Sequence, residues 1–373
     1  MAIVFLQTPP AIAAAFNEIP LVVQTPKARY DQLTQDLANA TSEAERTKIQ
    51  AEMLGLYYER NQVTLDPMTF VAVIGNGGAM NRTVTLTPEA GPDGKAYIDL
   101  SYIMRRAFVD VVDESQYSNY DHNLWAYGYI DDNGTRKAFF YALNAVGQPG
   151  YYDSSKGFEG YAKLTATPLT RYIGYPFRMT LRVGNTNLDC FTKIGNSTEE
   201  NRRINFPVGN IDIATSSDAR IDGVDIYTLE EDSEFLASYP IAEGCVPAAP
   251  FYVRWINTAG GWDSWMFERR EETDEVEDVN NIQLYIADPT DTQQTVSLNA
   301  ARTVTVGEGL LSKEDYRTLA ALPRSPRIQW YNEELQAWQT IVIAEAFSSS
   351  WNSRNGFGNV EFTFALPTVL TQF

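Results

Sequence analysis

Most of the chain consists of short runs of β-branched and aromatic residues that are bounded by Gly, Pro, Asn or Asp. TFVAVIG (69–75), RTVTLTP (82–88) and AYIDLSY (96–102) are examples near the start. From residue 162 onward such runs recur about every ten residues, a spacing typical of a β-sandwich or barrel. The sequence therefore predicts a mainly β protein of tandem β-sandwich or barrel-like domains.

The clearest local turn signal lies between LWAYGYID (124–131) and TRKAFFYAL (135–143). The intervening Asp132-Asn133-Gly134 contains Asn-Gly, which suits a type I′ turn because both central residues need positive φ angles. We expect a β-hairpin here.

A helical hairpin is predicted to interrupt this β pattern. Residues 28–60 are rich in Ala, Leu, Glu, Gln and Arg, which are good helix formers, and Ser42-x-x-Glu45 fits a capping box, with Thr41 as an alternative cap. We expect helices over about 28–39 and 43–60. Because the hairpin lies between the extended segments 19–25 and 68–76, it is an insertion into a β-domain.

The two helices carry an apolar stripe at helical spacing. The stripe either packs into the core of its own domain or forms a face for another subunit, and the sequence leaves both readings open. Its members are Leu33, Leu37, Ile49, Met53, Leu56 and Tyr57.

Three tryptophans lie close together in FYVRWINTAGGWDSWMFERR (251–270). We expect strands over Phe251–Ile256 and Ser264–Arg269, joined by a tight turn. Trp255 and Trp265 are predicted to pack into the core. Trp262, which directly follows two glycines, is predicted to be exposed and is a candidate interface residue.

The acidic run EETDEVED (271–278) is predicted to be a solvated loop. Oxygen ligands of this kind suit calcium, but the run lacks the spacing of an EF-hand loop. Further along, Ser312-x-x-Asp315 predicts the start of one short helix.

These signals divide the 373 residues into three predicted domains. The first, 1–147, is a β-domain that holds the helical insertion. The second, 148–250, is a β-domain that follows a loop rich in Gly and Tyr. The third, 251–373, is a β-domain with one helix.

The charge balance excludes some partners. The sequence contains 29 Lys and Arg residues and 48 Asp and Glu residues, which gives a formal net charge of −19. Such a surface repels phosphate backbones and anionic membrane surfaces, so no nucleic-acid partner is expected. No run of about 18 apolar residues predicts a membrane-spanning helix. The first residues lack a basic region and contain Pro9-Pro10, so a secretory signal is not predicted.

Residues for catalysis or cofactor binding are scarce. His122 is the single histidine of the sequence and lies in a polar loop, and no G-x-S-x-G or phosphate-binding loop occurs. Cys190 and Cys245 are expected to be buried thiols, although a bridge between them stays open. We predict no catalytic, cofactor-binding or metal-binding residues and no enzymatic activity.

Several motifs resemble structural proteins of tailed phages and prophages of Bacteroidetes-type bacteria. The main one is YVRWIN (252–257) followed by GGWD (260–263) and Trp265-x-Phe267. Three more occur in the expected order. They are AFN-x-IP (15–20), DG-x-A-x-IDL (93–100) with I-x-R-x-AF (103–108), and NVEFTF-x-LP (359–367). The helical hairpin departs from the family pattern.

This resemblance implies a virion component of the tail, tail tip, baseplate or connector region. Such a protein is made in the bacterial host cytoplasm and assembles with copies of itself and other virion proteins into an oligomeric ring or complex. The family offers no catalytic residues to carry over.

Two other functions remain open at this stage. One is a receptor- or glycan-binding β-module of a phage fibre or cell-surface protein, which exposed tryptophans on one face would favour. The other is a glycoside hydrolase or lyase of β fold, which would need two carboxyl groups facing each other across a cleft.

Overall fold

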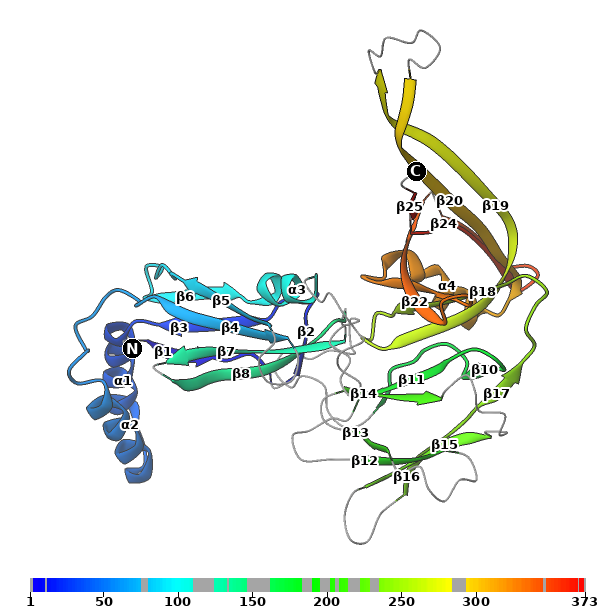
Figure 1. The fold of residues 1–373 in the computed structure, drawn as a ribbon. Helices are drawn as coiled ribbons and strands as arrows, with labels where there is room; N and C mark the ends of the chain where they lie inside the picture. The colour runs from blue at the N-terminus through cyan, green and yellow to red at the C-terminus, as the bar shows by residue number, and fades with distance from the viewer. Residues whose placement is uncertain are drawn as a thin grey trace. The chain divides into compact units, whose positions relative to one another are not determined.

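The computed structural model describes most of the chain, in two compact units. The described residues are 3–10, 12–74, 80–109, 124–132, 134–145, 162–182, 190–194, 202–204, 208–213, 222–228, 235–283, 293–344, 347–367 and 369–371. The first unit comprises Met1–Ala162, Arg182–Asp189 and Ile204–Asn210, and the second comprises Lys163–Leu181, Cys190–Arg203 and Ile211–Phe373. The fold is mainly β, as the sequence predicts (Figure 1).

In the described residues, the first unit holds two sheets and three helices. One sheet is antiparallel, in the order β1 (Val4–Gln7), β3 (Pro20–Gln24), β6 (Lys95–Asp99). The other has five strands, in the order β2 (Ile12–Ala14), β8 (Thr135–Leu143), β7 (Trp125–Asp132), β4 (Met68–Ile74), β5 (Met80–Leu86). The helices are α1 (Pro26–Asn39), α2 (Glu43–Gly55) and α3 (Ser101–Val109).

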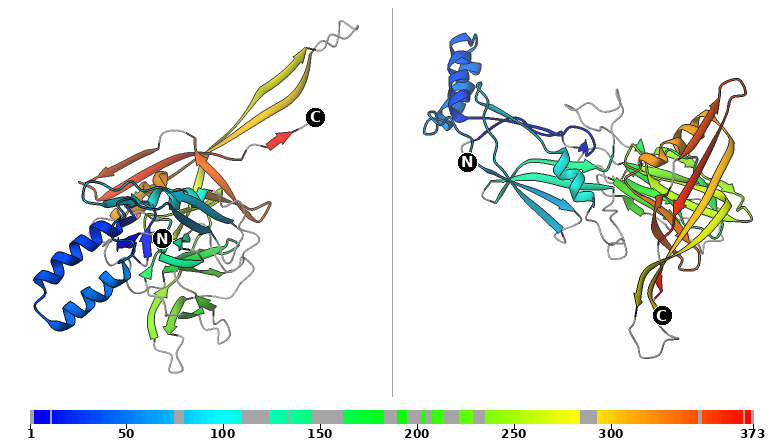
Figure 2. Two further views of the ribbon diagram at one scale, coloured as in Figure 1. Left: turned by 90° about the vertical axis from the view of Figure 1, so that its left-hand side faces the viewer. Right: turned by 90° about the horizontal axis from the view of Figure 1, so that it is seen from above.

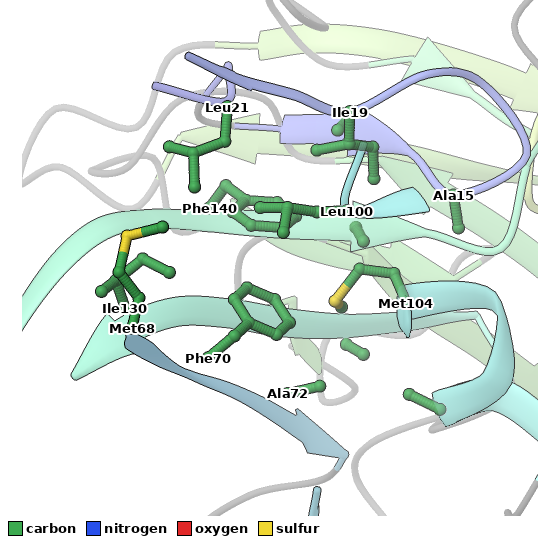
Figure 3. Close-up of a cluster of buried hydrophobic side chains, with 14 of the residues drawn as sticks. Ala15, Ile19, Leu21, Met68, Phe70, Ala72, Leu100, Met104, Ile130 and Phe140 are labelled. Atoms are coloured by element: carbon green, nitrogen blue, oxygen red, sulfur yellow. The ribbon is translucent and has the colours of Figure 1, made fainter. Parts of the chain in front are cut away.

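The core of this unit lies between the two sheets and α3. Met68, Phe70 and Ala72 of β4 are fully buried in this cluster, and the intervening Val71 and Val73 on the opposite face of the strand are buried as well. Phe70 and Phe140 stack with ring centroids 6.2 Å apart, in the middle of the cluster that Figure 3 shows. Burial of these apolar groups holds the two sheets together.

The predicted hairpins of the first unit are confirmed. Asp132 pairs with Thr135 across a two-residue connection, and Gly134 has φ +84°. Asn133 itself lies outside the described residues. The helical hairpin α1–α2 follows β3 and precedes β4, so it is an insertion between strands.

The prediction of an extended segment through Tyr102 was wrong, because β6 ends at Asp99 and α3 begins at Ser101. The Asp99 carboxylate accepts hydrogen bonds from Ser101 N (2.9 Å) and Ser101 Oγ (2.7 Å), which caps the helix. It also accepts one from Ile19 N (2.9 Å). The apolar face of α3 packs on the core through buried Met104 and Ala107, next to buried Leu100, which directly precedes the helix.

The described residues between 162 and 244 form three small sheets. Their orders are β14 (Val208–Ile213)–β11 (Phe177–Arg182)–β9 (Ala162–Lys163), then β13 (Arg202–Ile204)–β12 (Cys190–Ile194)–β15 (Gly223–Thr228)–β16 (Phe235–Pro240), and the parallel pair β10 (Thr170–Tyr172)–β17 (Ala242–Gly244). These short strands match the predicted second β region.

The C-terminal part of the second unit is a closed sheet. Its order is β23 (Ser348–Asn352), β24 (Phe357–Ala365), β22 (Ala337–Ile343), β21 (Ile328–Asn332), β18 (Pro250–Ile256), β19 (Trp262–Gln283), β20 (Gln293–Leu311), β25 (Val369–Thr371). Because β24 also pairs with β20, six of the strands close on themselves around one core. Helix α4 (Lys313–Ala320) contributes buried Leu319 to that core, and its predicted cap Ser312 accepts from Asp315 N at 3.1 Å.

The acidic run 271–278 is not a loop, contrary to prediction. It lies within β19, a strand of 22 residues that pairs with β20 from Glu268 to Gln283. The two strands extend away from the closed sheet as a long ribbon (Figures 1 and 2). We call Arg270–Gln283 and its paired segment of β20 the β-arm. The charge of a segment indicates that its side chains are solvated, but it does not indicate whether its backbone pairs with another strand. The sequence therefore predicted a loop.

The boundary expected at residue 250 falls inside the second unit, and the one expected at 147 lies outside the described residues. The segment that follows residue 162 is hydrogen-bonded to the β18–β19 turn. Thr165 Oγ1 donates to Trp262 O (2.9 Å), and Asn257 Nδ2 donates to Leu164 O (2.7 Å). These contacts join parts of the predicted second and third domains in one unit.

Gly128 tests the packing of the first unit. A Cβ at this position would lie 2.6 Å from Phe70 Cζ and 3.0 Å from Phe140 Cζ. We expect Gly128→Ala to lower the free energy of unfolding by about 1–3 kcal/mol, because both rings must move. Scanning calorimetry measures the loss. Gly55→Ala, where nothing lies within 4 Å, is the matched control and should be neutral or stabilising. Equal effects of the two variants would contradict the packing assignment.

Candidate assembly interface

The helical hairpin is capped at both helix starts. Thr25 Oγ1 accepts from Ala28 N (3.3 Å) at α1, and Ser42 Oγ accepts from Glu45 N (3.2 Å) at α2. The Glu45 carboxylate accepts from Thr41 N (3.3 Å), one residue before the position of an ideal capping box. The predicted start of the second helix is confirmed, whereas α1 begins at Pro26, two residues before the predicted start, and α2 ends at Gly55 rather than near residue 60.

The base of the hairpin is fixed to the β-body by backbone contacts. Thr25 N donates to Gly94 O (2.8 Å), and Lys27 N donates to Gln62 O (3.1 Å). Gly94 has φ +71°, and a Cβ there would lie 2.4 Å from Ala28 Cβ. Beyond this base the two helices project from the sheets of the first unit (Figure 2).

Part of the predicted apolar stripe lies between the two helices. Leu33 is buried, at 2% exposure, and Leu33 and Ile49 both line a groove between α1 and α2. Arg29 Nε donates to Glu52 Oε1 (2.7 Å) across the pair, which adds a charge-assisted link. The half-buried members of the stripe are Leu37, Ile49, Met53 and Leu56.

A second apolar surface, which the sequence analysis missed except for Tyr57, lies at the end of α2. Leu54 is 75% exposed and Tyr58 is 95% exposed, with Tyr57 and Val63 also exposed. The Arg60 guanidinium lies 3.8 Å from the Tyr57 ring centroid, and Tyr57 contacts Tyr58 edge-on. We call Leu54, Tyr57, Tyr58 and Val63 the Tyr58 patch. The consecutive tyrosines just after a helix were the signal available in the sequence.

Tyr and Arg are over-represented at the energetic centres of protein interfaces. Helix α2 has no buried residue, so its outer side contributes little to the core of its own unit. The combination of a projecting hairpin and the Tyr58 patch makes this region a candidate interface with another protein chain.

Trp262 is not exposed, contrary to prediction. Its side chain is 1% exposed and belongs to the second unit, whereas the hairpin residues belong to the first. The buried Arg254 guanidinium lies 4.4 Å from the Trp262 ring centroid and 4.3 Å from that of Trp338. Trp262 thus shields a buried cation, and the prediction failed because Gly261 packs against Leu164.

The prediction that Trp255 packs into the core is confirmed, and Trp265 packs partly buried against the same cluster. All seven tryptophans of the sequence lie in described segments, and none of them is exposed. The exposed tryptophan face that would favour glycan binding is therefore not found.

Asp263 is the buried carboxylate beside Trp262. Its Oδ1 accepts from Ala166 N (2.5 Å) and Thr167 N (3.1 Å). Burial raises the pKa of Asp263 to about 6, although these hydrogen bonds and the nearby Lys163 ammonium act to lower it. The carboxylate anchors the 163–181 segment to the start of β19.

Other chemistry is limited. Cys245 is a free, exposed thiol rather than a buried one, and the Cys190 side chain and His122 lie outside the described residues. Within the described segments no group of three or more His, Cys, Asp or Glu side chains is placed to hold a metal ion. No helix in those segments is long and apolar enough to cross a membrane.

Comparisons with known proteins give no family. No protein-family model matches the chain, and no curated protein matches it in sequence. Among solved structures, a chain in the crystal structure of Dpr2 Ig1-Ig2 in complex with DIP-Theta Ig1-Ig3 is 8% identical, with a TM-score of 0.16. That match covers 100% of this chain and 99% of the other.

The buried Asp263 gives a pH prediction. Its folded pKa of about 6 exceeds the ordinary 3.8, so the folded state binds more protons between these values and loses stability as pH rises through them. The difference corresponds to roughly 3 kcal/mol above pH 6. Asp263→Asn keeps the Oδ1 acceptor, so it should gain stability over the native chain at pH 7 but not at pH 4. Urea unfolding at several pH values checks this, and parallel pH profiles would refute it.

Proposed function

We propose that this chain is a structural, non-enzymatic subunit of a tailed-phage virion, in the tail, tail-tip, baseplate or connector region. It assembles with copies of itself and other virion proteins into an oligomeric ring or complex. The resemblance of the motifs around Trp255 and Trp262 supports the phage assignment. The subunit is made in the host cytoplasm and resides in the virion.

The observation that carries the proposal is the projecting hairpin. Leu33 of its stripe is buried, but the Tyr58 patch exposes large apolar side chains to solvent. Exposed apolar surface of this kind gains free energy when another chain covers it. Of the two readings of the hairpin, core element or assembly arm, its outer side favours the arm.

A second candidate function is glycan binding, and one observation favours it. The five-stranded sheet turns one face to the core, and its other face carries aromatic rings. Tyr127 and Tyr129 have ring centroids 6.4 Å apart, and Phe139 and Tyr141 have centroids 5.0 Å apart. The Arg136 guanidinium lies 4.8 Å from the Tyr129 ring centroid. Aromatic faces can stack on sugar rings, and binding on a glycan array that Tyr127→Ala and Tyr129→Ala abolish would favour this function.

The Tyr58 patch provides a test of the assembly function. We expect Leu54→Gln with Tyr58→Ser to keep the native melting temperature, because both side chains are exposed. The same variant should enter virions at about one tenth of the native level or less, because two contacts worth about 1 kcal/mol each are lost. Complementation of a phage that lacks the gene, followed by immunoblotting of purified particles, measures incorporation.

The matched control is Leu335→Gln with Tyr102→Ser, which removes a similar pair of side chains that are 62% and 63% exposed. It should enter particles normally. If the patch variant also assembles normally, the hairpin is not the interface. If antibodies against the native chain label no particles, the virion assignment itself fails.

A further inference from the structure

The outer edge of β19 is open along the β-arm. β18 pairs with β19 only as far as Glu268, and Arg269 N still donates to Ala249 O (2.8 Å). From Arg270 to Gln283, no strand in the described part of the chain pairs with this edge, although the opposite edge pairs with β20. A strand edge of this length presents a row of backbone N–H and C=O groups, which is a template for one more strand.

The opposite edge of the β-arm, which belongs to β20, is paired with other strands. β20 is covered by β24 from Thr303 to Leu311 and by β25 from Leu298 to Ala300. In the described part of the chain, strands therefore pair with the β20 edge of the β-arm and none pairs with the β19 edge.

The charge of the open edge restricts what can pair with it. Six of the eight residues in 271–278 are Asp or Glu, and the run contains no Lys or Arg. In the paired segment of β20, Arg302 is the cation, and it forms an ion pair with Glu272. Arg269 Nη1 lies 3.4 Å from the same Glu272 carboxylate. The arm therefore keeps a large excess of carboxylates.

A second copy of the chain is a poor occupant. Antiparallel pairing of two copies through 271–278 would place carboxylates opposite carboxylates, and like charges directly opposite are destabilising. An apolar strand would leave the carboxylates without partners. A strand that alternates cations with apolar residues satisfies both the open backbone groups and the charge.

We propose that the outer edge of β19 from Arg270 to Asp278 receives an extended, Lys- or Arg-rich strand of another protein chain. The strand adds antiparallel to β19, with backbone hydrogen bonds providing the register and the carboxylates providing specificity. This surface is separate from the Tyr58 patch, so the inference stands whether or not the hairpin mediates assembly.

The test uses the full-length chain and a synthetic peptide as long as Arg270–Asp278 that alternates Val with Lys or Arg. Fluorescence anisotropy measures its binding, and hydrogen exchange reports on the amides of the arm. We expect binding that protects the amides of Arg270–Asp278. A peptide with Glu in place of each Lys and Arg should not bind, and a basic peptide N-methylated at alternate amides should bind at least about tenfold more weakly.

A pair of matched variants distinguishes binding at the β19 edge from general electrostatic attraction to the acidic chain. Glu271→Gln, Glu275→Gln and Glu277→Gln together should weaken binding of the basic peptide by about tenfold, because each ion pair in water contributes modestly. The control carries the same change of charge on exposed acids elsewhere and should change the affinity by less than about twofold. It combines Glu89→Gln, Glu243→Gln and Glu334→Gln.

Three results would overturn the proposal. The first is no binding of the basic peptide at millimolar concentration. The second is equal binding of the N-methylated peptide or equal loss in both variants, which would indicate attraction without strand pairing. The third is concentration-dependent dimerisation of the native chain that protects Arg270–Asp278, which would make a second copy the occupant.

Discussion

The second unit depends on β19, which is a strand of the closed sheet over its first residues and a strand of the β-arm over the rest. Over its first residues β19 pairs with β18 and supplies Trp262, Met266 and Phe267 to buried clusters. From Glu268 onward its sequence changes to charged residues, and from Arg270 its outer edge is no longer paired with another described strand. The change in composition coincides with the departure of the strand from the closed sheet. Glu271 and Glu272 at the start of the arm are exposed, which avoids the cost of burying carboxylates in a core. The same backbone ladder with β20 runs through both parts, so the arm is a continuation of the closed sheet rather than an appended loop.

Two buried charged side chains lie near the β18–β19 turn, Arg254 on β18 and Asp263 on β19. Each is stabilised by neighbouring groups in fixed positions. The Arg254 guanidinium lies 4.4 Å from the Trp262 ring centroid and 4.3 Å from the Trp338 ring centroid, and its Nε donates to Gln329 Oε1 (2.7 Å). The Asp263 carboxylate accepts from two consecutive backbone N–H groups, Ala166 and Thr167. A displaced segment would leave a buried carboxylate unpaired, which costs far more than misplacing an apolar side chain. These polar contacts therefore specify which backbone lies against the β18–β19 turn, while the apolar core supplies most of the stabilisation.

Local sequence patterns predicted the helices and strands whose formation depends on neighbouring residues. Helix formers and the Ser42 cap predicted the helical hairpin, and runs of β-branched and aromatic residues predicted strands such as β4 and β18. Contacts between residues distant in sequence were not predictable in this way. Trp262 is buried because Gly261 allows the Leu164 backbone to approach, and nothing near Trp262 in the sequence indicates that contact. Helix α3 has buried residues at helical spacing, but the β-rich residues before it obscured its start. Of the candidate interface residues, Leu33 and Ile49 line the groove between the helices. Tyr58 and Val63 were not predicted, because they follow the helix and helical periodicity does not extend to them.

The two projecting elements differ in the kind of partner they can take. The Tyr58 patch offers large side chains without a fixed backbone register, so its gain on binding comes from burial and depends on the shape of the partner. The β-arm offers a backbone ladder with strong negative charge, so its gain depends on an extended and cationic partner. A chain with a net charge of −19 is a poor source of such a cationic strand, whereas an apolar surface can come from any copy. The proposed contacts between copies are therefore better suited to the hairpin, and the proposed contact with a different protein is better suited to the arm.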